Sequence, residues 1–255
     1  MATLTVRGLR LHFLELPESD PRAPAILFLH GSGGTHRIWL PQVRHFAPVY
    51  RAVALDLPGH GASEGDGADS IAAYREWVEA FMDAAGMEQA FLVGHSMGGA
   101  IALAIALGSP ARVSGIGLVG TGARLRVHPD ILEGLRGDPE RAAGLLSEWA
   151  YAPASGPELP AQGKKELLRG SAAVLEKDLR ACDAFDLMKE VDRIRVPAVV
   201  VCGAEDRLTP VKYARYLQDR IPGALLAVIP GAGHMVMLEK PDEVNHALAA
   251  WLDRH

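Results

Sequence analysis

Short apolar runs recur along this chain, and segments with helical periodicity lie between them. A strand that is covered on both faces has such a continuous apolar character, whereas a half-exposed strand alternates between apolar and polar residues. The runs at 25–29, 90–93 and 197–201 therefore predict buried strands of a parallel sheet. Further strands are expected at 53–55, 113–119 and 224–229, and an antiparallel edge hairpin is expected from 4–6 and 9–14.

Two segments between the apolar runs show the spacing of an amphipathic helix. Residues 70–85 place Ile71, Val78 and Phe81 at helical intervals, and residues 242–252 do the same with other apolar side chains. Strands that alternate with helices are typical of a doubly wound sheet. The pattern therefore predicts an α/β fold with a mostly parallel sheet of eight strands.

One long stretch breaks this alternation. Residues 121–192 contain no convincing strand, only amphipathic helical pieces that are separated by glycines and prolines. We interpret this stretch as a helical cap inserted into a core formed by 1–120 and 193–255. Its apolar side chains are expected to pack the cap or to line a substrate pocket beneath it.

Composition and charge narrow the class of protein. A chain of 255 residues with 49% hydrophobic content is long enough to bury the core of one α/β domain. The net charge of −5 comes without a long basic run, so we expect a small-molecule partner, not nucleic acid or a membrane. The first residues lack a basic leader followed by an apolar run, which predicts a cytoplasmic protein. Nothing in the sequence specifies an oligomeric state.

The pentapeptide Gly94-His95-Ser96-Met97-Gly98 carries the clearest chemical signal. It lies between the apolar run 90–93 and the helix-forming run 100–104, so Ser96 is expected on a sharp strand-to-helix turn, a nucleophile elbow. The turn is so tight that side chains two places before and after the serine would collide with the strand and the helix. Glycine at both positions is therefore expected to expose the serine hydroxyl.

A serine hydroxyl is a weak nucleophile at neutral pH, so it needs a general base and an acid that orients the base. Asp206 follows the predicted strand that ends near Cys202, and His234 follows the last predicted strand. Active sites of open α/β sheets lie outside the carboxyl ends of the strands, where all three side chains are expected. We therefore predict a Ser96, His234 and Asp206 triad, with Glu205 as the alternative acid.

Acyl transfer also places negative charge on the carbonyl oxygen, and two backbone N–H groups commonly stabilise it. Met97 N–H is one predicted donor. The glycine-rich segment after the strand 25–29 should supply the other from Ser32, with Gly33 as the alternative. The substrate-binding residues that we predict are Gly31, Gly33, Trp39 and Met235.

Cofactor and metal motifs are weak in this chain. The segment from Gly31 to Gly34 superficially resembles a dinucleotide-binding loop, but the final glycine of that motif is missing. The ten histidines include no H-E-x-x-H pair, and the two cysteines, Cys182 and Cys202, form no C-x-x-C motif. We predict no metal, no cofactor and no disulfide.

Five sequence blocks together resemble the α/β-hydrolase superfamily. They are 30–34, 56–63, 94–99, 203–207 and 233–235. The resemblance implies a serine-nucleophile, esterase-like member that cleaves a small carboxylic ester (EC 3.1.1) through an acyl-enzyme. Epoxide hydrolases and haloalkane dehalogenases of this fold carry an aspartate at the elbow, so Ser96 argues against both.

Other activities of the same fold stay open at this point. Carbon–carbon bond hydrolases, thioesterases, lactonases and hydroxynitrile lyases share the serine triad, and the sequence does not separate them. A ligand receptor on this fold is the alternative from a different functional class, because some such receptors keep the triad. The physiological substrate is not specified by the sequence.

Overall fold

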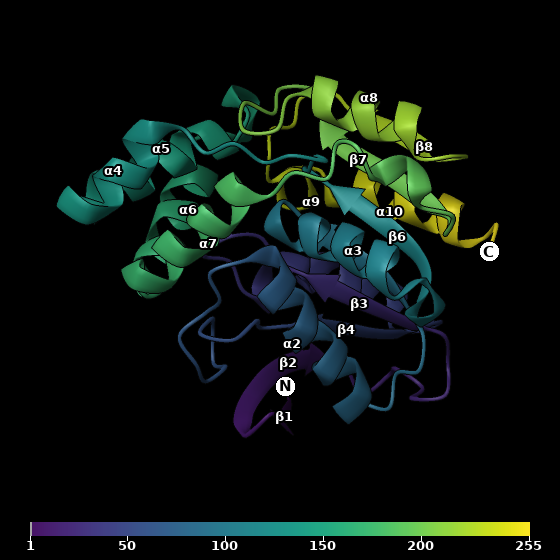
Figure 1. Ribbon diagram of the computed structural model, residues 1–255. Helices are drawn as coiled ribbons and strands as arrows, with labels where there is room; N and C mark the ends of the chain where they lie inside the picture. Colours follow the sequence, from purple (N-terminus) through teal and green to yellow (C-terminus); the bar gives the residue numbers. More distant parts are fainter. Residues whose placement is uncertain (1) are drawn as a thin grey trace.

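A central sheet of eight strands organises the molecule in a computed structural model that describes residues 2–255 (Figure 1). The spatial order of the strands is β1-β2-β4-β3-β5-β6-β7-β8. Their bounds are β1 Ala2–Val6, β2 Leu9–Glu15, β3 Ala25–Leu29, β4 Arg51–Leu55, β5 Ala90–His95, β6 Val113–Val119, β7 Ala198–Gly203 and β8 Leu225–Ile229.

Most neighbouring strands are parallel. β1 and β2 form an antiparallel hairpin, and β2 joins the rest of the sheet by antiparallel pairing with β4. All other neighbouring pairs are parallel, and Leu29 pairs with Gly94, which places the carboxyl ends of β3 and β5 together. The predicted fold class, a mostly parallel eight-stranded sheet, is confirmed.

Helices fill the connections between strands. Ser70 and Ser171 cap α2 and α7 by accepting hydrogen bonds from the backbone N–H three residues later, a common way to begin a helix. Four short 3-10 helices are η1 His36–Trp39, η2 Pro110–Arg112, η3 Pro153–Ser155 and η4 Val191–Arg193. The α-helices are α1 Leu40–Phe46, α2 Ile71–Ala84, α3 Met97–Gly108, α4 Pro129–Gly137, α5 Pro139–Ala150, α6 Glu158–Arg169, α7 Ala172–Ala184, α8 Val211–Arg220, α9 Val236–Glu239 and α10 Pro241–Leu252.

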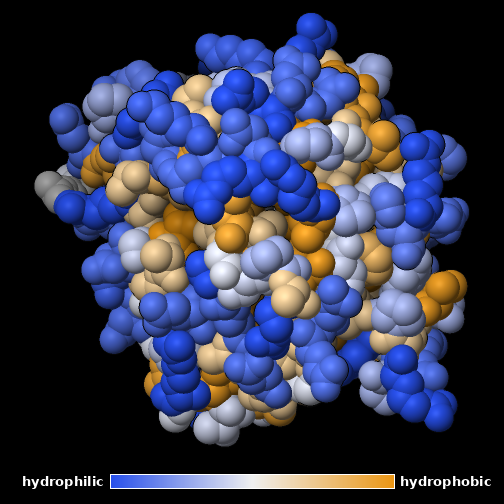
Figure 2. Space-filling view, turned by 45° about the vertical axis from the view of Figure 1, so that its right-hand side comes forward, coloured by the Kyte–Doolittle hydropathy of each residue, from blue (hydrophilic) through white to orange (hydrophobic). Residues whose placement is uncertain are grey.

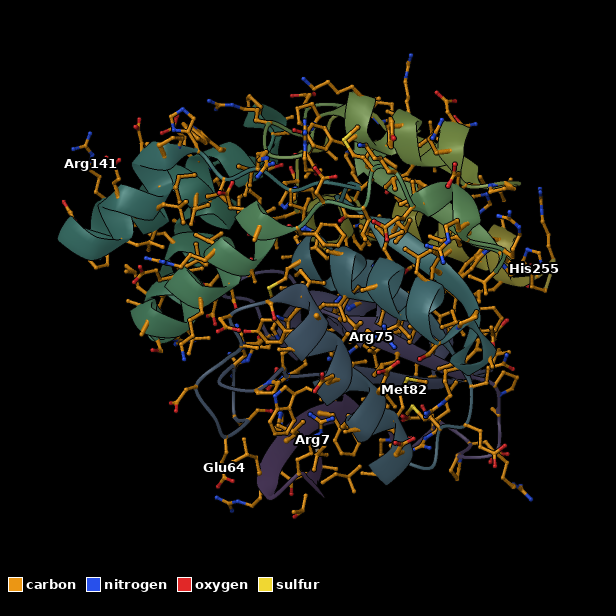
Figure 3. All side chains as sticks on the ribbon, in the orientation of Figure 1. Arg7, Glu64, Arg75, Met82, Arg141 and His255 are labelled. Carbon is orange, nitrogen blue, oxygen red and sulfur yellow. The ribbon has the colours of Figure 1, made fainter. Side chains whose placement is uncertain are left out.

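The sheet separates two hydrophobic cores. Successive residues of β3 point to opposite faces, so Leu27 belongs to the core that includes residues of α2, α3 and α8, whereas Phe28 belongs to the core that includes residues of α1 and α10. Met82 of α2, labelled in Figure 3, is fully buried in the first core, and Trp39 and Trp251 are fully buried in the second. Because both faces are covered, the central strands are apolar throughout.

Helices α4 to α7 lie between β6 and β7 and extend away from the sheet; we call them the α4–α7 segment (Figure 1). Arg141 of α5 lies at the far end of this segment in Figure 3. In the described chain, an isolated β-bridge between Arg124 and Asp186 joins the residues that lead into and out of this segment. The segment has a small hydrophobic cluster of its own, formed by Ile131, Leu135, Ala142, Leu146, Leu175 and Leu179.

The exterior is mainly polar. Figure 2 shows a face on which hydrophilic side chains predominate and hydrophobic ones occur in smaller groups between them. Val49, Leu168 and Val228 are the exposed large hydrophobic residues of the described chain, and they lie in the turn after α1, in α6 and in β8. Within residues 2–255, no helix combines the length and the apolar character needed to cross a bilayer.

Candidate active site

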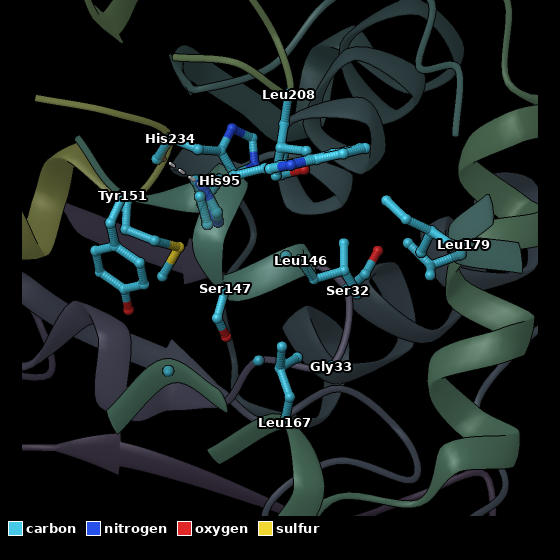
Figure 4. A pocket seen from close by; sticks show the side chains of 18 of the residues that line it. Ser32, Gly33, His95, Leu146, Ser147, Tyr151, Leu167, Leu179, Leu208 and His234 are labelled. Carbon is cyan, nitrogen blue, oxygen red and sulfur yellow. Dashed lines mark hydrogen bonds between the residues drawn. The ribbon is translucent and has the colours of Figure 1, made fainter. Parts of the chain in front are cut away.

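A cavity of about 730 Å³ lies between the carboxyl ends of the strands and the α4–α7 segment. The loops after β3, β5, β7 and β8 supply one part of its lining, and α5, α6 and α7 supply much of the rest. Figure 4 shows Leu146, Leu167 and Leu179 from these three helices together with Ser32 and His234 from the loops. The cavity therefore lies where open α/β sheets place their ligands.

Ser96 lines this cavity from the turn between β5 and α3. Its φ of 51° is unusual, because positive φ costs a residue with a side chain about 1–3 kcal/mol. Hydrogen bonds hold the turn: Ser96 N–H donates to Val119 O, and Ser96 O accepts from the Thr121 hydroxyl. The sharp strand-to-helix turn that the sequence predicts is confirmed.

The glycines around Ser96 are required by close packing. A Cβ atom on Gly94 would overlap the backbone of Gly98, and one on Gly98 would overlap the Leu29 carbonyl oxygen. A Cβ on Gly31 would lie 3.2 Å from Ser96 Cβ, so the loop after β3 passes directly beside the serine. The close packing predicted for the elbow glycines is confirmed.

His234 and Asp206 are joined by a hydrogen bond. His234 Nδ1 lies 2.9 Å from Asp206 Oδ2, both side chains are buried, and His234 lines the same cavity as Ser96. Burial by itself would raise the pKa of Asp206, but the His234 charge and hydrogen bonds from His234 and Thr209 lower it to about 2. Glu205, the alternative acid, is exposed and makes no recorded contact with His234 within residues 2–255.

The residues that carry the two predicted oxyanion donors are in contact through their side chains. Ser32 Oγ is 3.7 Å from Met97 Sδ, and Ser32 lines the cavity beside Gly31 and Gly33. In the part of the chain that the structure describes, neither Ser32 N–H nor Met97 N–H has a hydrogen-bond acceptor within the protein. Met97 is the first residue of α3, where N–H groups have no partner inside the helix.

Trp39 is the exception among the predicted pocket residues. Gly31, Gly33 and Met235 line the cavity, but Trp39 is absent from its wall and fully buried against Phe28 under the other face of the sheet. The prediction that Trp39 binds substrate is therefore wrong. Its position follows from the η1–α1 connection, which turns the indole into the second core instead of toward the strand ends.

Histidines next to the glycine turns hold loops. His30 Nε2 accepts from Leu57 N–H, so its Nδ1 carries the proton and donates to Gly31 O at 2.8 Å. Burial and the nearby His60 lower the pKa of His30 to about 4, in agreement with a neutral ring. His95 is buried, and the centre of its ring lies 4.5 Å from that of His234. Its Nε2 lies near enough to His234 O to donate a hydrogen bond to it.

Within residues 2–255, one cluster of side chains has nitrogen and oxygen atoms near enough to one another to hold a metal ion. It consists of His12, His36 and Asp56. The Nδ1 atoms of the two rings already lie 2.8 and 2.9 Å from the Asp56 carboxylate, which also accepts from Ala62 N–H. The carboxylate is therefore largely occupied by donors of His12, His36 and Ala62. These hydrogen bonds join β2 and η1 to the 56–63 turn.

Comparison with known proteins places the chain in a family. Residues 26–247 match the model of the alpha/beta hydrolase family. The chain belongs to the alpha/beta hydrolase family. The match covers nearly all of β3, the strands β4 to β8 and the α4–α7 segment. This assignment confirms the resemblance seen in the sequence and identifies the chain as a hydrolase.

Several relatives have described activities. The chain is 38% identical to a thermophilic esterase of known structure, over 99% of this chain and 97% of that one, with a TM-score of 0.87. It is 29% identical to an N-acyl homoserine lactone degrading enzyme, over 98% and 100% of the two chains, with a TM-score of 0.88. It is also 28% identical to 3-oxoadipate enol-lactonase 2 of Acinetobacter baylyi, over 99% of this chain and 96% of that protein.

Two groups of polar contacts at the site escaped the sequence analysis. Thr209 N–H and hydroxyl both donate to Asp206, an arrangement that the Asp-x-x-Thr spacing before Pro210 could have indicated. The second group surrounds Asp178 of α7, which reaches the loop after β3. No sequence signal identifies Asp178, because its partners lie more than 100 residues earlier in the chain.

Proposed function

We propose that this protein is a serine hydrolase that cleaves a small carboxylic ester through an acyl-enzyme. The observation that supports this most directly is the hydrogen-bonded pair His234 and Asp206, which opens onto the same cavity as Ser96. The free N–H groups of Ser32 and Met97 beside Ser96 add the means to stabilise a developing negative charge.

In this proposal His234 Nε2 removes the proton of Ser96 as Oγ attacks the ester carbonyl. The hydrogen bond from His234 Nδ1–H to Asp206 leaves Nε2 as the basic atom and stabilises the imidazolium that forms. No hydrogen bond between Ser96 Oγ and His234 is recorded among residues 2–255, and contacts of this kind often tighten only around substrate.

The carbonyl oxygen becomes an oxyanion that accepts hydrogen bonds from Ser32 N–H and Met97 N–H. When the tetrahedral intermediate collapses, the C–O bond to the alcohol breaks and His234 returns its proton to the leaving oxygen. Water then attacks the acyl-enzyme with the same base, and the products are a carboxylic acid and free Ser96. No metal or organic cofactor is required for these steps.

The cavity and the relatives guide the choice of substrate. We infer that residues 121–192 act as a cap that supplies the apolar wall of the substrate cavity, because α5, α6 and α7 contribute leucines to its lining. The 38% identity to a thermophilic esterase supports an open-chain ester. A lactone, which is a cyclic ester, is the second candidate because of the 29% identity to a lactone-degrading enzyme.

Labelling with a fluorophosphonate, followed by identification of the modified peptide, tests the nucleophile. We expect the label on Ser96 and a fall of about 10⁶-fold in the turnover of p-nitrophenyl butyrate for Ser96→Ala. Asp206→Asn should lower turnover by about 10⁴-fold, because a neutral amide can hold His234 in the wrong tautomer and no longer stabilises the imidazolium. Circular dichroism checks that both variants are folded.

Two outcomes would contradict the proposal. Label on another residue, or undiminished turnover by Ser96→Ala, would remove Ser96 from the role of nucleophile. Ligand binding followed by a single hydrolytic event without turnover would favour the receptor alternative. A panel that adds a thioester, a lactone and a vinylogous diketone separates the hydrolase alternatives from one another.

A further inference from the structure

Gly33 is one of the residues through which the α4–α7 segment contacts the loop that carries Ser32. Gly33 N–H donates to Asp178 Oδ2 of α7 at 2.8 Å. A Cβ atom on Gly33 would lie 2.9 Å from Leu167 and 3.0 Å from Leu175, so the leucines of α6 and α7 pack directly on its backbone. Its φ of 63° adds to the requirement for glycine. Three side chains of the segment thus surround one loop residue.

The hydrogen bonds on this loop fix the peptide groups on both sides of Ser32. The Gly31 carbonyl oxygen accepts from His30 Nδ1–H and from Gly34 N–H, at 2.8 and 3.0 Å. Because the N–H of a trans peptide points away from its carbonyl oxygen, these bonds set the direction of Ser32 N–H. The next peptide group, which joins Ser32 to Gly33, is held by Asp178 alone among the described side chains.

Asp178 is itself firmly held. Its carboxylate is fully buried, and it accepts from His60 Nε2 at 2.8 Å and from the Tyr74 hydroxyl by a short hydrogen bond. The other ring nitrogen of His60 faces the Pro58 carbonyl oxygen, which can only accept, so both nitrogens of His60 carry protons. A buried charge without partners is costly, and here His60 supplies the opposite charge.

We propose that Asp178 is a positioning residue, which holds Gly33 N–H so that the neighbouring Ser32 N–H points at the developing oxyanion. This inference rests on the proposed function, because it assigns Ser32 N–H to the oxyanion hole. The α4–α7 segment contributes no residue to the triad. The inference goes further than the proposed function because it gives a side chain of this segment an influence on the chemical step. The segment thereby affects the rate as well as substrate binding.

The geometry explains why a carboxylate serves here. One oxygen of Asp178 accepts simultaneously from the loop N–H and from His60, and the other accepts from Tyr74. A preorganised donor stabilises an oxyanion because little reorganisation is needed during the reaction. If Asp178 is lost, the peptide between Ser32 and Gly33 can rotate, and Ser32 N–H is no longer aimed by both of its neighbours.

The experiment compares Asp178→Ala and Asp178→Asn with the unchanged protein, using p-nitrophenyl butyrate as substrate. For Asp178→Ala we expect kcat to fall by about 10- to 100-fold, with KM changed by less than about twofold, because the donor is displaced but not deleted. Inhibition by an aryl trifluoromethyl ketone, which forms a tetrahedral oxyanion adduct, should weaken by the same factor. Asp178→Asn retains a side-chain acceptor and should recover part of kcat.

Two control variants separate positioning from general stability. Tyr74→Phe removes one donor to the Asp178 carboxylate and leaves the bond to Gly33 N–H in place, so kcat should fall less than in Asp178→Ala. Asp183→Asn changes a second carboxylate of α7, which accepts from Val127 N–H and does not touch the loop. It should leave kcat unchanged. Thermal unfolding of every variant checks the fold.

Each outcome is decisive. Unchanged kcat in folded Asp178→Ala, or a change in KM alone, would overturn the positioning role while Ser96 labelling and esterase turnover still supported the proposed function. Equal losses of kcat in Asp183→Asn and Asp178→Ala would also overturn it, because the effect would then be a general one of α7. Absence of Ser96 labelling in the unchanged protein would overturn the proposed function and this inference together.

Discussion

The sheet and the α4–α7 segment differ in how tightly their residues are packed. Every residue of β3, β5 and β7 is buried, and α3 buries nine of its twelve residues, whereas α6 buries none. Dense packing fixes backbone positions, and all three predicted triad residues lie at the ends of sheet strands. The looser segment instead surrounds the cavity.

The two regions meet at a few polar junctions. One is the contact between Asp178 and Gly33. Another joins the end of α5 to the loop of His234, where Met235 N–H donates to Ala150 O and Glu239 accepts from Ala152 N–H. If the proposed function holds, the sheet region carries the chemistry and the segment the specificity, and these contacts connect the two.

The largest expected effect comes from overpacking the sheet region. Gly98→Ala would drive a methyl group into the Leu29 carbonyl oxygen, and neither the strand nor the helix can move without breaking the core. We expect the free energy of unfolding to fall by more than about 4 kcal/mol. Urea denaturation measures it, and a loss below about 1 kcal/mol would show that the elbow adapts more easily than its packing indicates.

Protonation of Asp206 should lower the free energy of unfolding by a smaller amount, and reversibly. Its pKa is lowered to about 2 in the folded protein, against about 3.9 in an unfolded chain. A carboxyl group with a lowered pKa stabilises the folded protein at pH values above its pKa in the unfolded chain. This stabilisation is lost as the pH falls through the pKa in the folded protein. We expect the free energy of unfolding of the unchanged protein to exceed that of Asp206→Asn by on the order of 2 kcal/mol at pH 7. This difference should decrease between about pH 4 and pH 2.

Urea denaturation at several pH values measures this difference in the free energy of unfolding. Glu205→Gln, on the exposed neighbour, controls for the loss of one negative charge. An advantage that stayed constant down to pH 2 would mean that the carboxylate of Asp206 is not stabilised by its surroundings.

Leu146→Ala tests the specificity of the α4–α7 segment. Leu146 lines the cavity and belongs to the small hydrophobic cluster of the segment. We expect kcat/KM for p-nitrophenyl octanoate to fall about tenfold relative to the acetate, because a long acyl chain loses apolar contact. Leu168→Ala, on an exposed side chain of α6, is the control. Equal changes for both esters would place the acyl chain elsewhere.

The smallest expected effect is a gain in stability. Gly144 lies within α5, and no other atom lies within 4 Å of the position that its Cβ would occupy. Gly144→Ala should raise the free energy of unfolding by about 0.5–1 kcal/mol, because alanine loses less backbone entropy in a helix. Thermal or urea unfolding measures the change. A loss of stability would show that α5 packs more tightly than the open space around Gly144 indicates. The contrast between the packing at Gly144 and the packing at Gly98 would then be weaker.

Local patterns predicted much of the sheet region. The apolar runs located all eight strands to within a few residues, and the elbow glycines predicted a tight turn that the structure confirms. The α4–α7 segment was predicted only as helical pieces, since amphipathic helices can pack in several arrangements with similar burial. Trp39 shows the same limit: an aromatic residue that follows the glycine-rich loop after β3 can face either side of the connection.

The sequence alone determined the order of the strands along the chain, the elbow at Ser96 and the loops that carry Asp206 and His234. These features depend on residues that are neighbours in the chain, so local sterics and periodicity encode them. Only the tertiary structure decided which acid meets His234, which face receives Trp39 and that Asp178 contacts Gly33. Such contacts join residues that are distant in the chain, and packing of the whole fold determines their geometry.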